Sequence, residues 1–151
     1  MNLLQWLRNW YRLGPMEKPQ LDESEQIFMG LEIPAVIDAH LAWRKRLEDC
    51  ILDRSQEELD IGVIVQDNRC VLGQWIYGQA ARSTLSLHPE FTALRESHRH
   101  FHLCAARVVQ TLRTQGVAAA QSMLESDFDR LSKDIVFHLV SLIQKERTLH
   151  E

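Results

Sequence analysis

The stretch EFTALRESHRHFHLCAARVVQTLRTQ, residues 90–115, decides the fold. Its apolar residues recur at intervals of three and four, which is the spacing of a buried face on an α-helix. Gly116 follows the stretch and is a natural helix stop. The sequence therefore predicts a long amphipathic helix from about Glu90 to Gln115, whose inner face comprises Leu94, His98, Phe101, Ala105, Val108 and Leu112.

Two further long helices are predicted on either side of this one. A helix over about residues 34–53 begins at Pro34, a residue favoured at the first helical position. A helix over about residues 118–147 carries apolar residues at heptad-like intervals that suit packing in a bundle. A shorter helix, capped by Asn68, would carry Cys70 and the apolar residues after it. No segment alternates with a period of two, so the predicted fold is all-α, an antiparallel four-helix bundle.

The first thirty residues are predicted to lie outside this bundle. Residues 1–13 have the spacing of a short amphipathic helix, with Trp6 and Trp10 on its apolar face, and Gly14-Pro15 ends it. We expect an N-terminal amphipathic segment at 1–15, a polar linker at 16–30 and the helical bundle at 31–148. The amphipathic face can pack on the bundle or on a neighbouring subunit, which we favour. The alternative is a membrane surface, to which one short helix binds only weakly.

Composition narrows the class of protein. The chain has 151 residues, a formal net charge of -4, 45% apolar residues and 25% charged residues, which fits one globular domain. Its charge gives no basic stripe, so we expect no nucleic-acid partner. Three widely spaced cysteines and no recognisable secretory signal predict free thiols in a reducing cytoplasm. No apolar run has the length of a membrane-spanning helix.

Four residues form a candidate metal site: His40, Cys70, His98 and His102. The last two are four apart, so their imidazoles share one helix face, and His40 lies on the apolar face of the preceding long helix. Buried imidazoles each need a hydrogen-bond partner, and a shared metal removes that cost. Cys70 is expected in the first turn of its helix, where the helix dipole favours the thiolate. Together they would fill a tetrahedral Zn²⁺ shell with no position left for substrate, which predicts a structural or sensory site and not an enzyme.

Simpler interpretations exist for each residue. A lone histidine on an apolar face is usually a satisfied core residue, and a free cysteine is usually a small buried apolar one, as we expect for Cys50 and Cys104. His100 is rotated to the solvent side of its helix. A di-iron bundle would require Glu-x-x-His pairs facing inward, and the sequence has none. A nucleophilic pair of Cys70 with His98 lacks an evident orienting group and a glycine-rich oxyanion loop.

Three stretches resemble the chemoreceptor zinc-binding (CZB) domain family. They are HLAWR at residues 40–44, CVLGQWIYG at residues 70–78 and HRHFH at residues 98–102. In the family these stretches supply the single histidine, the cysteine and the paired histidines of a 3His/1Cys zinc site, and all four are present here in the same order. The resemblance covers about residues 34–145. It implies a cytoplasmic bacterial sensory domain that folds as a helical bundle and forms a homodimer.

The resemblance also implies a signalling output. Family members regulate an attached chemoreceptor coiled coil, in chemotaxis, or a diguanylate cyclase, in c-di-GMP signalling. No output domain is recognisable after the bundle, so we expect an unidentified partner of one of these classes. The expected function is a zinc-binding regulatory module that responds to metal occupancy or to oxidation of Cys70. The alternative is an interaction domain with a purely structural zinc, associated with a membrane through its N-terminal helix.

Overall fold

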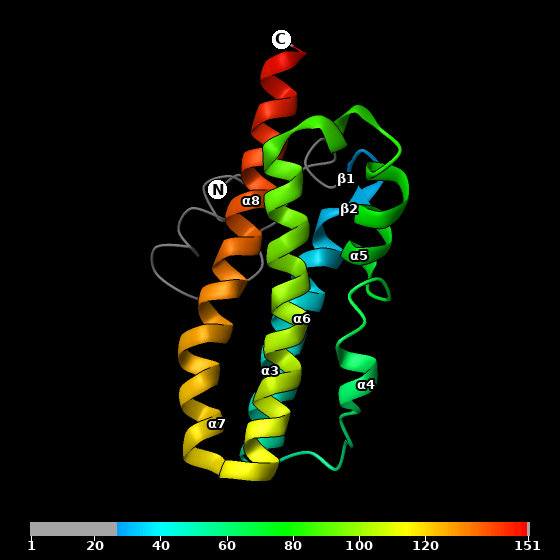
Figure 1. Cartoon of the computed structure of the whole chain (residues 1–151). Coiled ribbons are helices and arrows are strands. Elements are labelled where there is room, and N and C mark those ends of the chain that lie inside the picture. The colour runs from blue at the N-terminus through cyan, green and yellow to red at the C-terminus, as the bar shows by residue number, and fades with distance from the viewer. Residues whose placement is uncertain (1–26, 151) are drawn as a thin grey trace.

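The computed structural model describes residues 27–150, and this part of the chain is mostly helical (Figure 1). Three long helical segments dominate it: α3 (Ile33–Ile51), α6 (Pro89–Gln115), and the continuous run of α7 (Val117–Met123), the π-helix η3 (Leu124–Phe128) and α8 (Asp129–Leu149). The long helices expected at 34–53, 90–115 and 118–147 are therefore confirmed. The predicted N-terminal helix over residues 1–13 and the first part of the linker, up to residue 26, lie outside the described residues.

The ends of the long helices follow from local sequence. Pro34 and Pro89 occupy the first turns of α3 and α6, where a missing backbone N–H costs nothing. Gly116 separates α6 from α7 with a φ of 94°, a conformation that strains other residues. The chain therefore reverses within one residue, and α7, η3 and α8 return alongside α6 (Figure 1).

The fourth position of the expected bundle holds no long helix. Short elements fill it instead: α4 (Ile61–Ile64), α5 (Val71–Trp75), the π-helix η1 (Ile76–Ala80) and the 3₁₀-helix η2 (Thr84–Leu87). The all-α class is confirmed for residues 27–150, but the antiparallel four-helix arrangement is not, since α3 and α6 run in the same direction in Figure 1. The reason lies in residues 52–88, where separate capping residues start several short helices in place of one long helix.

A small hairpin precedes α3. Strands β1 (Ile27–Phe28) and β2 (Leu31–Glu32) pair antiparallel, and the turn residues Met29 and Gly30 have φ values of 48° and 83°. Two residues with positive φ between two strands form a tight hairpin connection. Trp75 Nε1 donates to the Met29 carbonyl oxygen at 2.9 Å, so the hairpin holds the end of α5. Strands of two residues are too short for the alternation by which sequence analysis recognises a strand.

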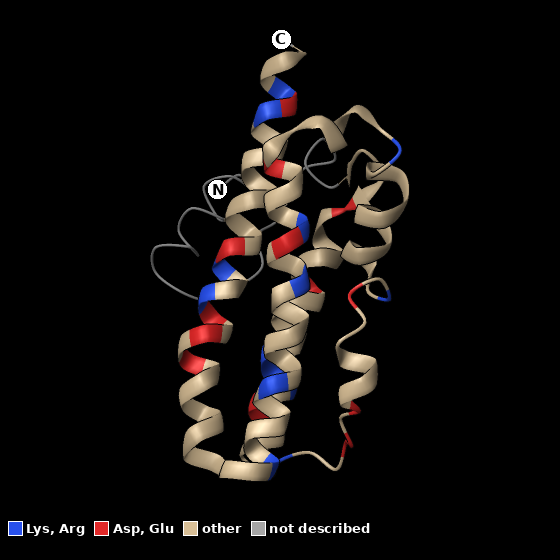
Figure 2. Cartoon of the chain, in the orientation of Figure 1, with Lys and Arg blue, Asp and Glu red and all other residues tan. Residues whose placement is uncertain are grey.

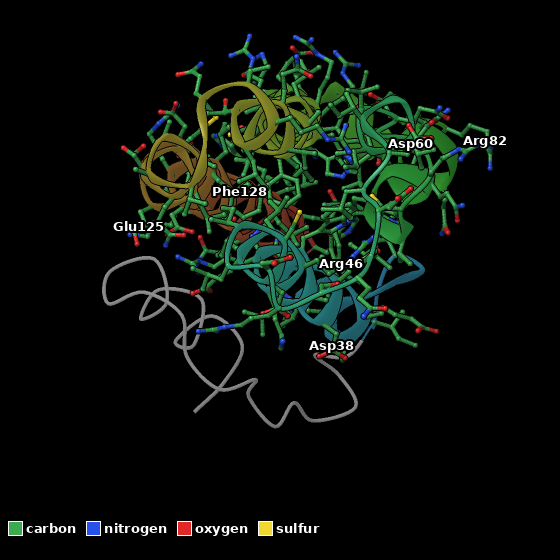
Figure 3. All side chains as sticks on the ribbon, turned by 90° about the horizontal axis from the view of Figure 1, so that it is seen from below. Asp38, Arg46, Asp60, Arg82, Glu125 and Phe128 are labelled. Carbon is green, nitrogen blue, oxygen red and sulfur yellow. The ribbon has the colours of Figure 1, made fainter. Side chains whose placement is uncertain are left out.

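The core lies between α3, α6 and the α7–η3–α8 segment. Phe128, in η3, is fully buried and points inward between the helices (Figure 3). Other fully buried side chains, all apolar, come from every layer of the fold: Leu47, Ile76, Leu85, Leu94, Leu124 and Leu142. None of the helices among the described residues combines the length and the apolar character needed to cross a membrane.

An ion-pair cluster ties α3 to the start of α8. Arg44 Nε and Nη2 donate to the two carboxylate oxygens of Asp129 at 3.0 and 3.1 Å, and Arg44 Nη1 donates to Glu48 at 2.8 Å. The hydrogen bonds to Asp129 raise the pKa of Arg44. Elsewhere, basic and acidic residues intermingle along the long helices (Figure 2). The Arg44 cluster fixes α3 against α8 one helical turn from His40.

Candidate metal centre

Cys70, His98 and His102 meet at one point between α5 and α6. The Cys70 sulfur lies 3.1 Å from His98 Nε2 and 3.6 Å from His102 Nε2, and the two histidine nitrogens are 3.2 Å apart. Among the described residues, these three form the group whose ligand atoms all lie within 4.8 Å of one another. The structure therefore brings together three of the four residues that the sequence predicted as metal ligands.

The α6 helix places both histidines because they are one turn apart on its buried face. Only 2% of His98 and 4% of His102 is exposed. Their rings meet edge to face, with centroids 4.6 Å apart. His100, between them in sequence, is exposed, as the helix period predicted.

His102 is oriented by a backbone group that the sequence did not identify. The Ile64 carbonyl, in α4, lies 2.8 Å from His102 Nδ1, and a carbonyl can only accept a hydrogen bond. His102 Nδ1 therefore carries the proton, and the lone pair of Nε2 points toward Cys70 and His98. Metal-binding histidines commonly have such a partner on the second nitrogen. Asp60 holds α4 in place, since its side chain accepts from Gly62 N at 2.8 Å.

Cys70 is the N-cap of α5, and the prediction that Asn68 caps this helix is wrong. The Gly73 N–H donates to the Cys70 sulfur at 3.3 Å. Gly73 is required there because a Cβ atom would collide with the Asp67 carbonyl oxygen of the preceding turn. The sulfur thus takes the role that a serine or aspartate oxygen usually has at this position.

The expectation that this position favours the thiolate is only half right. Backbone N–H groups at the start of α5 do lower the pKa of Cys70, but burial is the larger effect and raises it above its ordinary value. Cys70 is therefore a thiol at neutral pH in the metal-free protein. Binding of a metal ion has to release this proton.

His40 lies beside the group of three without joining it. It lines the same cavity of about 40 Å³ as Cys70, His98 and His102. Its ring stacks on Phe101, with centroids 5.0 Å apart and an angle of 18° between the rings. Its Nε2 is shielded from solvent, and burial lowers the pKa of His40 to about 4. His40 remains the predicted fourth ligand, and in this structure it lines the same cavity as the other three while lying outside their group.

The donor atoms fit a zinc ion. Ordinary Zn–N and Zn–S bonds meeting at a tetrahedral angle place two nitrogens about 3.3 Å apart and a nitrogen and a sulfur about 3.6 Å apart. The distances among Cys70, His98 and His102, from 3.1 to 3.6 Å, are close to these edges. Burial and the neighbouring His102 lower the pKa of His98 to about 3, so its ring is neutral and offers a lone pair. His98 Nδ1 is buried and has no hydrogen-bond partner within residues 27–150.

The other two cysteines take no part in this centre. Cys104 is buried on α6, and burial raises its pKa to about 11. Cys50 is half-buried on α3 and packs against the core. Both are free thiols in the structure, as predicted, and their interpretation as packing residues agrees with these positions.

Comparison with known proteins agrees with this centre. Residues 40–109 match the family model described as the chemoreceptor zinc-binding domain. The matched range begins at His40 and includes Cys70, His98 and His102, so it contains all four predicted ligands. No curated protein and no solved structure shows significant similarity to the chain.

Proposed function

We propose, from the match of residues 40–109 to the chemoreceptor zinc-binding domain family, that this chain is a zinc-binding regulatory module and not an enzyme. The convergence of the Cys70, His98 and His102 donor atoms within 4.8 Å of one another carries the proposal. Zinc, when bound, supplies a fixed tetrahedral centre that holds side chains from separate helices together. His40 is the fourth ligand, which completes a closed site without a position for substrate.

His40 links occupancy of the site to the packing of the helices. To join the other ligands, its ring has to leave Phe101, on which it stacks. Phe101 in turn packs on Phe128, with ring centroids 4.8 Å apart. Phe128 ends η3, directly before Asp129, the partner of Arg44 on α3. A movement of His40 should therefore alter the contact between α3 and the start of α8. This contact is what zinc occupancy changes in the proposed module.

Metal content measured on purified protein tests the site. We expect one zinc per chain, and Cys70→Ala and His98→Ala to lose it, because each removes one of the converging donor atoms. Cys104→Ala is the matched control, since this thiol lies on the same helix as His98 and outside the group. Full zinc binding by both ligand variants would overturn the proposal. Wild-type affinity in His40→Ala would remove His40 from the ligand set and leave a three-residue site.

Oxidation of Cys70 is a second candidate stimulus. The observation that favours it is a surface groove that reaches this side chain. With a peroxide, the sulfur would attack one oxygen, the O–O bond would break, and a sulfenic acid would form as water leaves. The oxidised sulfur is a poorer ligand, so zinc should be released. Zinc release is followed during peroxide titration in a Cys50→Ala, Cys104→Ala background, and unchanged metal content with fully oxidised Cys70 would exclude this stimulus.

The output is a protein–protein contact. The family resemblance supports a cytoplasmic location in a bacterium, a homodimer, and a chemoreceptor or diguanylate cyclase as the partner. Pull-down from extract of the source cells, with and without a chelator, asks whether a partner exists and whether metal controls it. Equal capture in both conditions, with helix packing unchanged by metal, would favour the rival function of an interaction domain with a structural zinc. The membrane alternative for residues 1–13 is tested by liposome sedimentation with and without that segment.

A further inference from the structure

A groove of about 340 Å³, open to solvent, lies between α3 and the segment that carries α4. Trp43 and Arg46 line it from α3, and Asp60 and Val63 line it from the α4 side. Figure 3 labels Arg46 and Asp60 on these two elements. The groove is large enough for a hydrated metal ion, whereas the cavity among the four predicted ligands, at about 40 Å³, has room for about one water molecule.

The groove and the small cavity share side chains. Cys70, His102 and Trp43 line both of them. His98 and His40 line the small cavity but not the groove. An ion that enters from the groove therefore meets the sulfur of Cys70 and the ring of His102 before it meets the other two ligands.

Charge on the walls suits passage of a cation. Arg46 is neutralised by Glu57, since its Nη2 lies 2.5 Å from the Glu57 carboxylate, and its guanidinium is held over the Trp43 ring at 4.1 Å. Glu58, Asp60 and Arg69 also line the groove and all three are exposed, so together with the Arg46–Glu57 pair the groove has a net charge of -1. Carboxylates at the opening of a cleft raise the local concentration of a positively charged solute.

The α4 wall of the groove also orients His102, one of the predicted ligands. The Ile64 carbonyl belongs to α4 and accepts the hydrogen bond that orients His102. α4 is a single helical turn, and residues 54–60 before it have no regular secondary structure. An outward movement of α4 would widen the groove and at the same time release His102, whereas its return would restore the ligand.

We infer that this groove is the route by which the divalent cation, and the chelators that compete for it, reach and leave the metal centre, with α4 as its gate. The inference rests on the proposed zinc site and adds how exchange at that site is controlled. Cys70 and His102 are the first ligands to be bound and the last to be released. Narrowing the groove should slow binding and release together, because both directions use one path.

Zinc exchange in groove-filling variants tests the route. Val63→Trp places a large ring in the groove from a side chain that is 44% exposed, so the core is not disturbed. Association of zinc is followed by stopped flow, and release by transfer to a coloured chelator in excess. We expect both rates to fall about tenfold, the effect of roughly 1.4 kcal/mol in the barrier, with the dissociation constant unchanged. Gln66→Trp, on the same wall, is the second variant should the first fail to fold.

Two controls separate this route from others. Val117→Trp adds the same ring at a similarly exposed site on α7, outside the groove, and should leave both rates unchanged. Val71 lines the small cavity and not the groove, so Val71→Trp narrows the cavity without filling the groove. Slower exchange in Val71→Trp with unchanged exchange in Val63→Trp would overturn the proposed route. In the zinc-free protein, alkylation of Cys70 by iodoacetamide should slow in Val63→Trp and not in Val117→Trp.

The outcome also distinguishes the two proposals. A wild-type chain that binds no zinc would refute the zinc site itself. A chain that binds one zinc, with exchange rates unaltered by Val63→Trp and Gln66→Trp, would refute only the groove as the route.

Discussion

Replacement of Phe101 by leucine should make the protein bind zinc more tightly while making it less stable. His40 stacks on Phe101 at a centroid distance of 5.0 Å and lies outside the group formed by the other three ligands. The stacked pair stabilises the metal-free position of His40, and zinc binding has to break it. Leucine keeps most of the buried volume but removes the ring face that holds His40.

The magnitude follows from the contacts of this ring. An aromatic pair contributes about 0.5–1.5 kcal/mol beyond its buried area, which corresponds to roughly a two- to tenfold lower dissociation constant when the pair is absent from the metal-free state. Phe101 is 3% exposed and also packs on Phe128 at 4.8 Å, so the substitution should lower the free energy of unfolding by about 1–2 kcal/mol.

Competition with a chromophoric chelator measures the affinity, and urea denaturation of the zinc-free protein measures the stability. Phe91→Leu is the matched control, because Phe91 lies on the same helix, is 2% exposed and lies outside the His40 stack. It should cost similar stability and leave zinc affinity unchanged. The reasoning is refuted if Phe101→Leu binds zinc more weakly than Phe91→Leu does.

Three further outcomes are expected. Gly73→Ala should abolish zinc binding and destabilise the fold, because its Cβ atom would collide with the Asp67 carbonyl oxygen. Gly78→Ala is the control, since the space around this Cβ position is open, and it should leave metal content and thermal unfolding unchanged. Asp129→Asn should lower the free energy of unfolding by about 1 kcal/mol in urea denaturation, a modest loss because the pair with Arg44 is partly exposed; a double-mutant cycle with Arg44→Ala that finds no coupling would contradict this. Hydrogen bonds from His150 and His88 lower the pKa of Glu146 in the folded protein below its ordinary value of 4.5. The charged carboxylate therefore stabilises the fold at any pH above 4.5, and this stabilisation is lost as the pH falls through the lower pKa of the folded state. Glu146→Gln should therefore be less stable than wild type at pH 7 and nearly equal to it at acid pH, with the exposed Glu32→Gln as the control.

Residues within one helix were the easiest to predict. The interval between His98 and His102 equals about one turn, so a shared face follows from the helix period whatever the rest of the fold does. The same period predicted the exposure of His100. Pro34, Pro89 and Gly116 mark the beginnings and the end of these helices because their backbone preferences are local.

The short elements before α6 could not be predicted in the same way. Cys70 was expected inside a helix capped by Asn68, and it caps α5 itself. The difference depends on the turn at Asp67 approaching Gly73, which is a contact between two backbone segments. The Ile64 carbonyl that orients His102 has no side-chain signature at all, because any residue at position 64 has a carbonyl. Its role appears only when α4 is placed against α6.

For His40, the sequence predicted which face of α3 carries the residue but not its position relative to the other ligands. Helical spacing placed it on the inner side of α3, and the structure puts it there, lining the cavity of the other ligands. The period does not specify how far α3 slides or rotates against α6, and this relative position decides whether His40 reaches the other ligands or stacks on Phe101. Phe101 belongs to the same predicted face of α6 as His98. The helix face that carries His98 and His102 therefore also supplies the ring on which His40 stacks, outside the group of the other ligands. A site with three converging donors and a fourth predicted ligand stacked on a neighbouring ring can change state when that side chain moves, and this is the physical reason to expect regulation from the proposed centre.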